Sequence, residues 1–472
     1  MSLDLIRRAS KLLREVAYHV TAIVAQKGGD LELIDLIGDH DQPDCYVLAV
    51  DVGTTTVSLY LVDMATGRIS AKLAVDNSQA VYGADFLARI HFCQKPLGLE
   101  ALQELIVECI NESLRKLTEQ QRFLPGDIYA VSVAGNPTMT HLLLGLSPHH
   151  LCREPYVPVI NQPLQLKAKE LMINAHPEAP VYVFPNTGSY FGGDAVAGIL
   201  AAGMHRRNAV SLLTDVGTNA EIVLGNREWL VACAGAAGPA LESGGAKAGM
   251  PAREGAIERV RIDRNTLEPE IEVIGGGPAK GICGSGLIDL VAELFLSGII
   301  DVRGHITDGK QSPRLRISGD AKAYAVALAE SGEAYHDILV DELDIGNLVR
   351  AKGAMYTALS LITERLGVGF KDLDIFFVAG SFGEHIDPRS AIAIGMLPDI
   401  PLERFHVLGN SAGLGACMML VSYKLHKEVE YITSKSAYLQ LNVENEFMNR
   451  LNAALFIPHT DRELFPSVRI PS

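Results

Sequence analysis

The chain has 472 residues, of which 48% are hydrophobic and 21% charged, and its 41 basic and 56 acidic side chains give a net charge of −15. This length exceeds what one hydrophobic core usually serves, so we expect two or three domains. The acidic balance argues against nucleic acid or an anionic membrane as the main partner.

Seven cysteines are scattered along the chain without a C-x-x-C pair. This argues against a disulfide framework and against a cysteine-ligated zinc or iron–sulfur site. Glycine or charge interrupts every apolar run before it could span a bilayer, and the mixed charges of residues 1–20 are unlike a signal peptide. We therefore expect a cytoplasmic protein with reduced thiols.

Residues 1–44 predict a helix around residues 5–16, strands near 20–24 and 31–37, and an acidic linker over 38–44. This is too little chain to fold alone. We interpret residues 1–44 as the remnant of a small middle or linker domain whose beginning is missing.

From Cys45 onward strand and helix patterns alternate, which indicates an α/β fold. The predicted strands are 47–51, 130–134, 181–184, 211–215 and 375–379. The predicted helices are 83–93, 99–120, 194–204, 285–296, 345–366 and 411–427, with Ser285 as a cap and Gly298 and Gly367 as terminators. Small residues at 192–198 and 284–286 predict close crossings of elements.

One sequence motif occurs twice. Residues 48–56 read Leu-Ala-Val-Asp-Val-Gly-Thr-Thr-Thr, and residues 212–219 read Leu-Leu-Thr-Asp-Val-Gly-Thr-Asn. Each copy predicts a strand, a tight turn and a second strand, that is, a β-hairpin. In such a turn glycine permits positive φ and close approach of a phosphate, while backbone N–H groups and hydroxyls bind the anion. The candidate phosphate ligands are Gly53, Thr54, Thr55, Thr56, Gly217, Thr218 and Asn219.

The two aspartates of these turns, Asp51 and Asp215, are candidate catalytic residues that hold Mg²⁺, in part through water, and orient the attacking water. A single turn is equally well explained as a plain hairpin with an Asx-type hydrogen bond. The repetition favours the phosphate clamp.

A third element reads Val-Ala-Gly-Ser-Phe-Gly-Glu-His over residues 378–385. Here a buried strand runs into a glycine loop, and Gly380, Ser381, Phe382 and Gly383 are candidates to lie against a base or ribose. His385 is expected to be a polar loop residue rather than a catalytic base.

In this order, the three elements resemble the actin-like ATPase superfamily, which includes heat-shock chaperones and sugar kinases. The resemblance implies a duplicated ribonuclease H-like fold, with two half-domains around a nucleotide cleft that binds ATP and Mg²⁺. We expect half-domain I at residues 45–208 and half-domain II at 209–408. A C-terminal helical segment, 409–472, is expected to pack back on half-domain I.

A closer resemblance is to the ATP-dependent reductive activators of corrinoid proteins. It is carried by residues 12–15, Asn-Pro-Thr-Met-Thr-His at 136–141, Ala-Ala-Gly-Pro-Ala-Leu-Glu at 236–242, Gly-Ser-Gly-Leu-Ile-Asp at 284–289, Gly-Ser-Phe-Gly-Glu-His-Ile-Asp-Pro at 380–388 and Gly-Asn-Ser-Ala-Gly at 409–413. The family implies that ATP hydrolysis drives reduction of a Co(II) corrinoid protein of a methyltransferase system to Co(I).

Members of that family usually carry an N-terminal [2Fe–2S] domain, which this chain lacks. The resemblance therefore implies that the electron comes from such a domain in a longer protein or from a separate ferredoxin-like donor. A homodimer is an expectation at the level of the family.

Two alternatives stay open. A small-molecule kinase of the same fold would need a carboxylate base, for which Asp194 is the candidate, although its position at a helix start suits capping equally well. A nucleotide-switched assembly protein would show ATP-dependent sedimentation.

Two other features allow two interpretations. Residues 233–255 are either a loop that contacts a partner or takes part in catalysis, or a surface connection. Lys352 lies where relatives in the superfamily line the nucleotide pocket, but we expect a solvated helical lysine. The acidic pair Asp341 and Glu342 is expected on a solvated face.

Overall fold

The computed structural model describes residues 2–27, 30–38, 45–217, 220–235, 246–309, 312–380, 385–440 and 446–469. The chain divides into two compact units, the first formed by residues 1–203 and 411–436 and the second by residues 204–410 and 437–472. Among the described residues no helix is long and apolar enough to cross a membrane. All seven cysteines are described, and their thiols are free.

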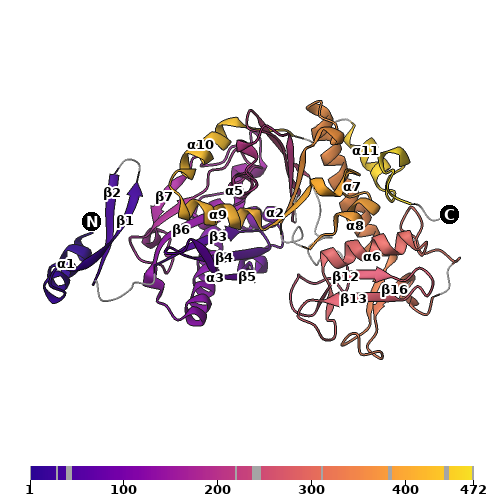
Figure 1. Ribbon diagram of the computed structural model, residues 1–472, viewed down its shortest axis with the longest axis horizontal. Coiled ribbons are helices and arrows are strands. Elements are labelled where there is room, and N and C mark those ends of the chain that lie inside the picture. Colours follow the sequence, from indigo (N-terminus) through magenta and orange to yellow (C-terminus); the bar gives the residue numbers. More distant parts are fainter. Residues whose placement is uncertain are drawn as a thin grey trace. The chain divides into compact units, whose positions relative to one another are not determined.

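The first unit is built on a six-stranded sheet in the order β5-β4-β3-β6-β8-β7 (Figure 1). The strands β3, β4 and β5 are antiparallel, whereas β6 and β8 run parallel to β3. Their bounds are Tyr46–Val52 (β3), Thr56–Asp63 (β4), Arg68–Asp76 (β5), Ile128–Gly135 (β6), Leu164–Lys167 (β7) and Pro180–Val183 (β8).

Besides the N-terminal helix α1 (Leu3–Glu15), the described residues of the first unit form α2 (Phe86–Phe92), α3 (Gly98–Gln121), α4 (Pro137–Leu143), α5 (Gly193–Ala202), α9 (Ser411–Val421) and α10 (Leu425–Lys435). The helix α3 buries an apolar stripe at helical spacing against the sheet, formed by Leu102, Ile106, Ile110, Leu114 and Leu117. Each is 0% exposed, and burial of one such side chain contributes roughly 1.5–3 kcal/mol.

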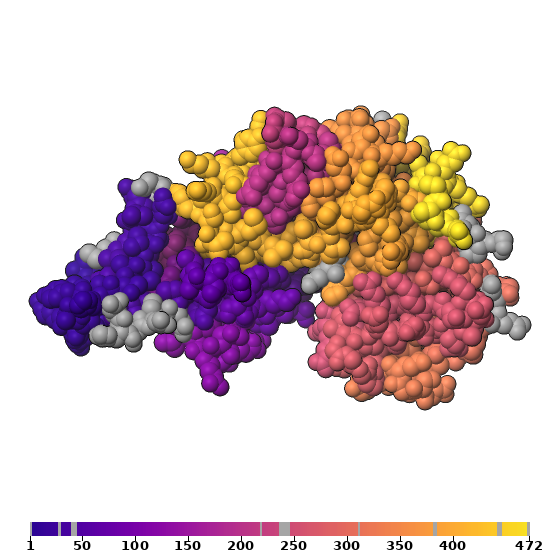
Figure 2. Space-filling view, in the orientation of Figure 1, coloured from indigo at the N-terminus to yellow at the C-terminus, as the bar shows by residue number. Residues whose placement is uncertain are grey.

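The helices α9 and α10 come from the end of the chain but pack on the first unit. A Cβ atom at Gly415 of α9 would lie 2.1 Å from the carbonyl oxygen of Ala197 in α5, so only glycine permits this crossing. In the space-filling view the surface of residues 411–436 joins directly to that of the first unit (Figure 2). Our prediction of one helix over residues 411–427 is not met, because the chain forms two helices here, separated at residues 422–424.

The second unit repeats this plan with a six-stranded sheet in the order β19-β18-β9-β10-β11-β20. The bounds are Ser211–Val216 (β9), Ala220–Gly225 (β10), Leu230–Gly235 (β11), Ile375–Ala379 (β18), Phe405–Gly409 (β19) and Ser436–Tyr438 (β20). As in the first unit, a three-stranded antiparallel meander adjoins two parallel strands. The matching strand order confirms the predicted duplicated α/β fold.

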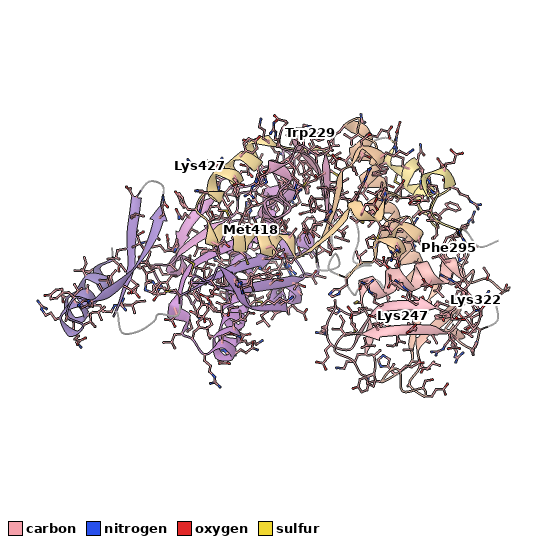
Figure 3. The ribbon with its side chains drawn as sticks, viewed as in Figure 1. Trp229, Lys247, Phe295, Lys322, Met418 and Lys427 are labelled. Carbon is pink, nitrogen blue, oxygen red and sulfur yellow. The ribbon has the colours of Figure 1, made fainter. Side chains whose placement is uncertain are left out.

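The second unit also has two three-stranded sheets of its own, β13-β12-β14 and β15-β16-β17. Their strands are Ala256–Ile262 (β12), Pro269–Val273 (β13), Gly281–Ile282 (β14), Leu315–Ser318 (β15), Ala321–Ala327 (β16) and Ile338–Asp341 (β17). The helices are α6 (Gly284–Leu296), α7 (Glu342–Arg365), α8 (Pro388–Ala393) and α11 (Phe447–Ala454). Phe295 of α6, labelled in Figure 3, is 1% exposed and belongs to the core of this unit.

The division of the chain differs from our expectation at its C-terminal end. Residues 411–436 belong to the first unit, as expected, but the chain from Ala437 belongs to the second. The reason is that β20 joins the second sheet beside β11, where the backbone N–H of Leu439 donates to the carbonyl of Ala232 (2.8 Å).

At the N-terminus α1 (Leu3–Glu15) is followed by a separate two-stranded sheet of β1 (Val20–Lys27) and β2 (Asp30–Gly38), close to the predicted elements. The carboxylate of Asp35 in β2 is buried and forms an ion pair with Arg8. It also accepts a hydrogen bond from the hydroxyl of Tyr129 (3.3 Å). Polar contacts thus join this segment to the larger sheet, and the linker residues 39–44 lie outside the described residues.

The cap of α6 differs from the prediction. The N-cap residue is Cys283, and Ser285 lies inside the first turn, where its hydroxyl is 3.2 Å from the Cys283 sulfur. Gly298 and Gly367 follow the ends of α6 and α7 with φ values of +74° and +65°, as the prediction requires.

Lys352 of α7 is not solvated, and our expectation for it is wrong. It is 0% exposed, and its ammonium group donates to the carbonyl oxygen of Phe456 and to that of Pro458 (2.8 Å). Burial lowers the pKa of Lys352 well below its ordinary value. The lysine therefore anchors the chain that follows α11 to the long helix.

We expect Lys352→Met to lower the free energy of unfolding by about 1–3 kcal/mol, because two buried carbonyl oxygens lose their donor. The unfolded chain binds the lysine proton more tightly than the folded one, so wild-type stability should rise with pH from the lowered pKa toward 10.5. Urea denaturation at neutral and alkaline pH measures both effects. The exposed control Lys371→Met should change stability by less than about 0.5 kcal/mol, and equal stability of the two variants would contradict the anchor.

Candidate functional site

The first copy of the repeated motif, residues 48–56, forms the predicted hairpin. Asp51 is half-buried on the central strand β3, between Ser58 of β4 and Ala134 of β6. The strand ends at Val52, and the turn residues Gly53, Thr54 and Thr55 lead into β4 at Thr56.

Glycine is required at position 53 for a reason other than the predicted one. Gly53 is not among the residues with positive φ. Its N–H donates to the carbonyl of Thr56 (3.0 Å), and a Cβ atom here would lie 2.6 Å from that same oxygen. The turn is so tight that a side chain would break its closing hydrogen bond.

Asn136 couples the first turn to α4. Its amide oxygen accepts from the N–H of Met139 (3.0 Å) and caps the helix, while its amide nitrogen donates to the hydroxyl of Thr54 (3.0 Å). A side chain that both donates and accepts is needed for this pair of bonds. The Asn-Pro-Thr-Met-Thr-His motif thus begins at a residue that holds the turn.

His141, the last residue of that motif, has a structural role. One ring nitrogen lies 2.6 Å from the carbonyl of Pro137, and the other accepts from the N–H of Val159 (3.0 Å). Burial lowers the pKa of His141, which fits a neutral ring that donates on one side and accepts on the other.

The second copy of the motif, which begins at residue 212, joins β9 to β10 in the other unit. Asp215 is half-buried on β9, paired with Glu221 of β10 and Ala379 of β18. Gly217 follows the strand, whereas Thr218 and Asn219 lie outside the described residues. The two aspartates therefore have equivalent positions, each at the end of a strand with an antiparallel neighbour on one side and a parallel neighbour on the other.

The third motif begins directly against this second aspartate. Gly380 has a φ of +96°, and a Cβ atom there would lie 2.4 Å from the carbonyl oxygen of Val216 and 2.7 Å from a carboxylate oxygen of Asp215. The structure thus brings Gly380 and Asp215 together. Ser381, Phe382 and Gly383 lie outside the described residues, and their roles stay predictions.

Asp194 lies near Asn136, the residue that binds the first turn. A Cβ atom at Gly192 would be 2.5 Å from an Asp194 carboxylate oxygen and 2.6 Å from the Cα of Asn136, the residue that binds Thr54. Burial raises the pKa of Asp194 to about 6, although the N–H of Ala195 donates to its carboxylate (2.8 Å). A carboxylate that titrates near neutral pH is suited to accept a proton.

Other charged residues serve the fold. Asp341 is buried rather than solvated, because it caps α7 through the N–H groups of Leu343 and Asp344 and pairs with Lys247 (2.7 Å), labelled in Figure 3. The carboxylate of Glu342 accepts from the N–H of Ile306 (2.8 Å). Our expectation of a solvated acidic pair is therefore wrong.

In the segment 233–255, residues 236–245 lie outside the described residues. Lys247, after this gap, is held by the ion pair with Asp341. His385 lies 3.0 Å from a carboxylate oxygen of Glu258, in agreement with a polar loop residue.

Two units of one sheet plan, each with an Asp-x-Gly turn at the end of its central strand, define an actin-like ATPase fold of the ASKHA class. Residues 209–469 match the family model described as the C-terminal domain of RACo, the ASKHA domain, and residues 46–207 match the RACo middle region. The chain belongs to the RACo family. Membership of the ASKHA class implies ATP binding. The middle region is therefore the first six-stranded sheet, whereas we expected residues 1–44 to be its remnant.

Several relatives are similar over most of the chain. The corrinoid activation enzyme RamQ of Eubacterium limosum is 32% identical over 88% of this chain and 71% of the relative. A [Co(II) methylated amine-specific corrinoid protein] reductase of Methanosarcina barkeri is 23% identical over 86% and 75%. A solved structure of a reductive activator for corrinoid, iron-sulfur protein has a TM-score of 0.94 and 38% identity, and the match covers 99% of this chain and 74% of that one.

We expect Gly380→Ala to weaken ATP binding by roughly 10-fold or more, because the methyl group would displace the carboxylate of Asp215 and the backbone at Val216. Isothermal titration calorimetry measures the affinity. The matched control is Gly332→Ala, which has a φ of +73° and no atom within 4 Å of the added Cβ. The control has the same backbone strain without the clash, so equal loss of affinity in both variants would contradict a role of the close approach.

Proposed function

We propose that this chain hydrolyses ATP to drive the reduction of an inactive Co(II) corrinoid protein to Co(I). The observation that carries the proposal is the duplicated Asp-x-Gly turn on equivalent strands in a chain of the RACo family. The similarity to RamQ and to the solved reductive activator supports corrinoid proteins as the substrate class.

In this proposal the two turns bind the phosphate oxygens of ATP through N–H groups and hydroxyls of Gly53, Thr54, Thr55, Thr56, Gly217, Thr218 and Asn219. Gly380, Ser381, Phe382 and Gly383 lie against the adenosine. Asp51 and Asp215 would hold Mg²⁺ in part through water, since half-buried carboxylates beside phosphate-binding turns are the donors that this ion takes in nucleotide sites. When bound, Mg²⁺ neutralises charge on the transferred phosphoryl group.

Asp194 is proposed to be the general base. Its carboxylate accepts a proton from the attacking water as the bond from water oxygen to the γ-phosphorus forms and the bond to the β–γ bridging oxygen breaks. The products are ADP and inorganic phosphate. A kinase would use the same base on a substrate hydroxyl, so phosphate release distinguishes the two reactions.

The electron is proposed to come from a [2Fe–2S] domain or ferredoxin-like donor outside this chain. All seven cysteines are described, and among the described residues no group of three Cys, His, Asp or Glu side chains could hold a metal ion. The residues present therefore do not fit an iron–sulfur cluster. A cytoplasmic location and a homodimer are also proposals.

We expect this chain to hydrolyse ATP and a Co(II)-loaded corrinoid protein to stimulate the turnover. Asp51→Asn and Asp215→Asn should each reduce turnover by about 10²-fold or more while circular dichroism stays unchanged, because each removes a carboxylate that orients the metal and water. The exposed control Asp320→Asn should retain full turnover. Full activity in both site variants would contradict the assignment of the turns, and release of a phosphorylated small molecule without phosphate would favour the kinase.

The pH dependence of turnover tests Asp194. The base must be ionised, and its pKa is raised to about 6, so the rate should fall about tenfold per pH unit below that value and level off above it. Asp194→Asn should lower the plateau by roughly 10²–10⁴-fold and abolish this limb of the profile. A profile that stays flat down to about pH 5 in the wild type would exclude Asp194 as the base.

A further inference from the structure

Arg89 of α2 is a buried cation whose hydrogen bonds all go to uncharged acceptors. It is 0% exposed, and its guanidinium donates to the carbonyl of Thr54 (2.6 Å), the carbonyl of Gly83 (2.9 Å), the side-chain oxygen of Gln79 (3.1 Å) and the sulfur of Met139 (3.2 Å). All four acceptors are uncharged. Among the described residues Arg89 forms no ion pair at contact distance. The carboxylate of Asp85 caps α2 and attracts the guanidinium only from a longer distance.

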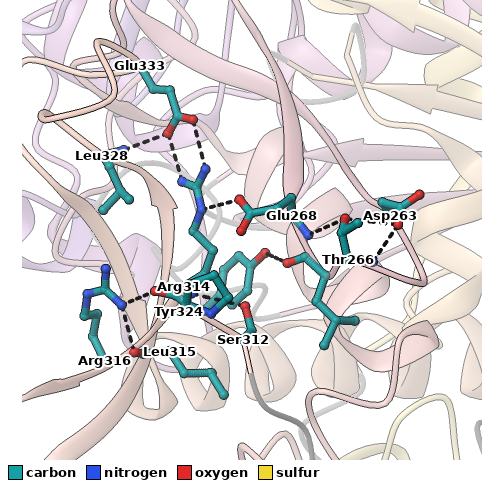
Figure 4. A network of polar contacts seen from close by, with 12 residues as sticks. Asp263, Thr266, Glu268, Ser312, Arg314, Leu315, Arg316, Tyr324, Leu328 and Glu333 are labelled. Carbon is teal, nitrogen blue, oxygen red and sulfur yellow. Dashed lines mark hydrogen bonds and ion pairs between the residues drawn. The ribbon is translucent and has the colours of Figure 1, made fainter.

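A second buried arginine in the chain shows the usual arrangement. Arg314 is 7% exposed and forms ion pairs with Glu268 (2.7 Å) and Glu333 (2.8 Å), as Figure 4 shows. These carboxylates raise the pKa of Arg314, whereas burial lowers the pKa of Arg89 to about 10. Arg89 therefore stays protonated at neutral pH. Because a buried charge without a contacting counter-ion is costly, the burial of Arg89 against the first turn needs an explanation.

Arg89 is part of a system that turns the carbonyl groups of the first turn toward the protein. The Gly53 oxygen accepts from the Asn77 side chain (2.8 Å), the Thr54 oxygen from Arg89, and the Thr55 oxygen from the Asn77 N–H (2.7 Å). The N–H of a trans peptide points opposite to its carbonyl. The N–H groups of Thr54, Thr55 and Thr56 are therefore directed away from the groups that hold the carbonyls.

We propose that Arg89 is a positioning residue that prepares the first turn for the phosphates of ATP and that the bound nucleotide is the anion which balances its charge. Arg89 acts through the Thr54–Thr55 peptide, whose carbonyl it binds and whose N–H it thereby polarises. The proposal rests on the proposed binding of ATP at this turn. In this proposal the contribution of Arg89 to the binding free energy increases with the negative charge of the ligand.

The test compares the affinities of Mg·ATP and adenosine by calorimetry. Arg89→Met should weaken binding of Mg·ATP roughly 10- to 100-fold and leave adenosine affinity nearly unchanged, so the ratio of the two affinities falls. Arg89→Lys keeps the charge but not the fork of donors and should restore part of the ratio. In turnover assays the Met variant should show a raised KM for Mg·ATP and a smaller change in kcat.

The matched control is Arg314→Met, which removes a buried arginine that has its own carboxylates and should leave the ratio unchanged. Should Arg89→Met fail to fold in urea titrations, Arg89→Gln removes the charge with a polar side chain and is judged by the same ratio. An equal loss for ATP and adenosine, or no loss, would overturn the role of Arg89 while the proposed ATPase stands. Absence of ATP binding by the wild type would overturn both.

Discussion

The structure depends on one constraint, namely that a backbone turn which binds phosphate must direct N–H groups toward the ligand and satisfy its carbonyl groups elsewhere. Strand pairing achieves most of this. The residue before each turn lies between an antiparallel and a parallel neighbour, as Asp51 does between Ser58 and Ala134, so the sheet satisfies its backbone on both sides. The turn itself projects beyond the sheet, where other groups must bind its carbonyls.

Among the described residues, different groups contact the two copies. In the first unit, side chains from three separate segments bind the turn: Asn77, Arg89 and Asn136. In the second, Gly380 packs its backbone against Asp215 and Val216, with no room for a side chain. Duplication therefore preserved the strand plan, while the support of each turn became specific. This difference agrees with separate tasks for the two turns, one rich in donors and one joined to the glycine loop.

Much of the fold was predictable from the sequence because its signals are local. Strand periodicity around Asp51 and Asp215 identified both hairpins, and the order of three motifs identified the class. The burial of Lys352, the ion pair of Asp341 with Lys247 and the support from Arg89 were not predictable, because each depends on a contact with a residue far along the chain. A lysine or arginine in a helix looks the same in sequence whether it faces water or two carbonyl groups.

The raised pKa of Asp194 and the lowered pKa of Arg89 have a common physical origin, since burial penalises both ionised groups. In the proposed function each charge would be compensated, that of the arginine by the nucleotide anion and that of the aspartate by the proton it accepts from water. A ligand that binds one state of the chain more tightly than another stabilises the state that it prefers. The stabilising free energy increases with the difference between the two affinities. In the proposed reaction hydrolysis changes the charge of the bound nucleotide, so the electrostatic environment of Arg89 and Asp194 would differ between the two nucleotide states. A chain that couples ATP to a partner must possess a difference between nucleotide states, and under the proposed function these two buried groups would contribute to it within a single unit.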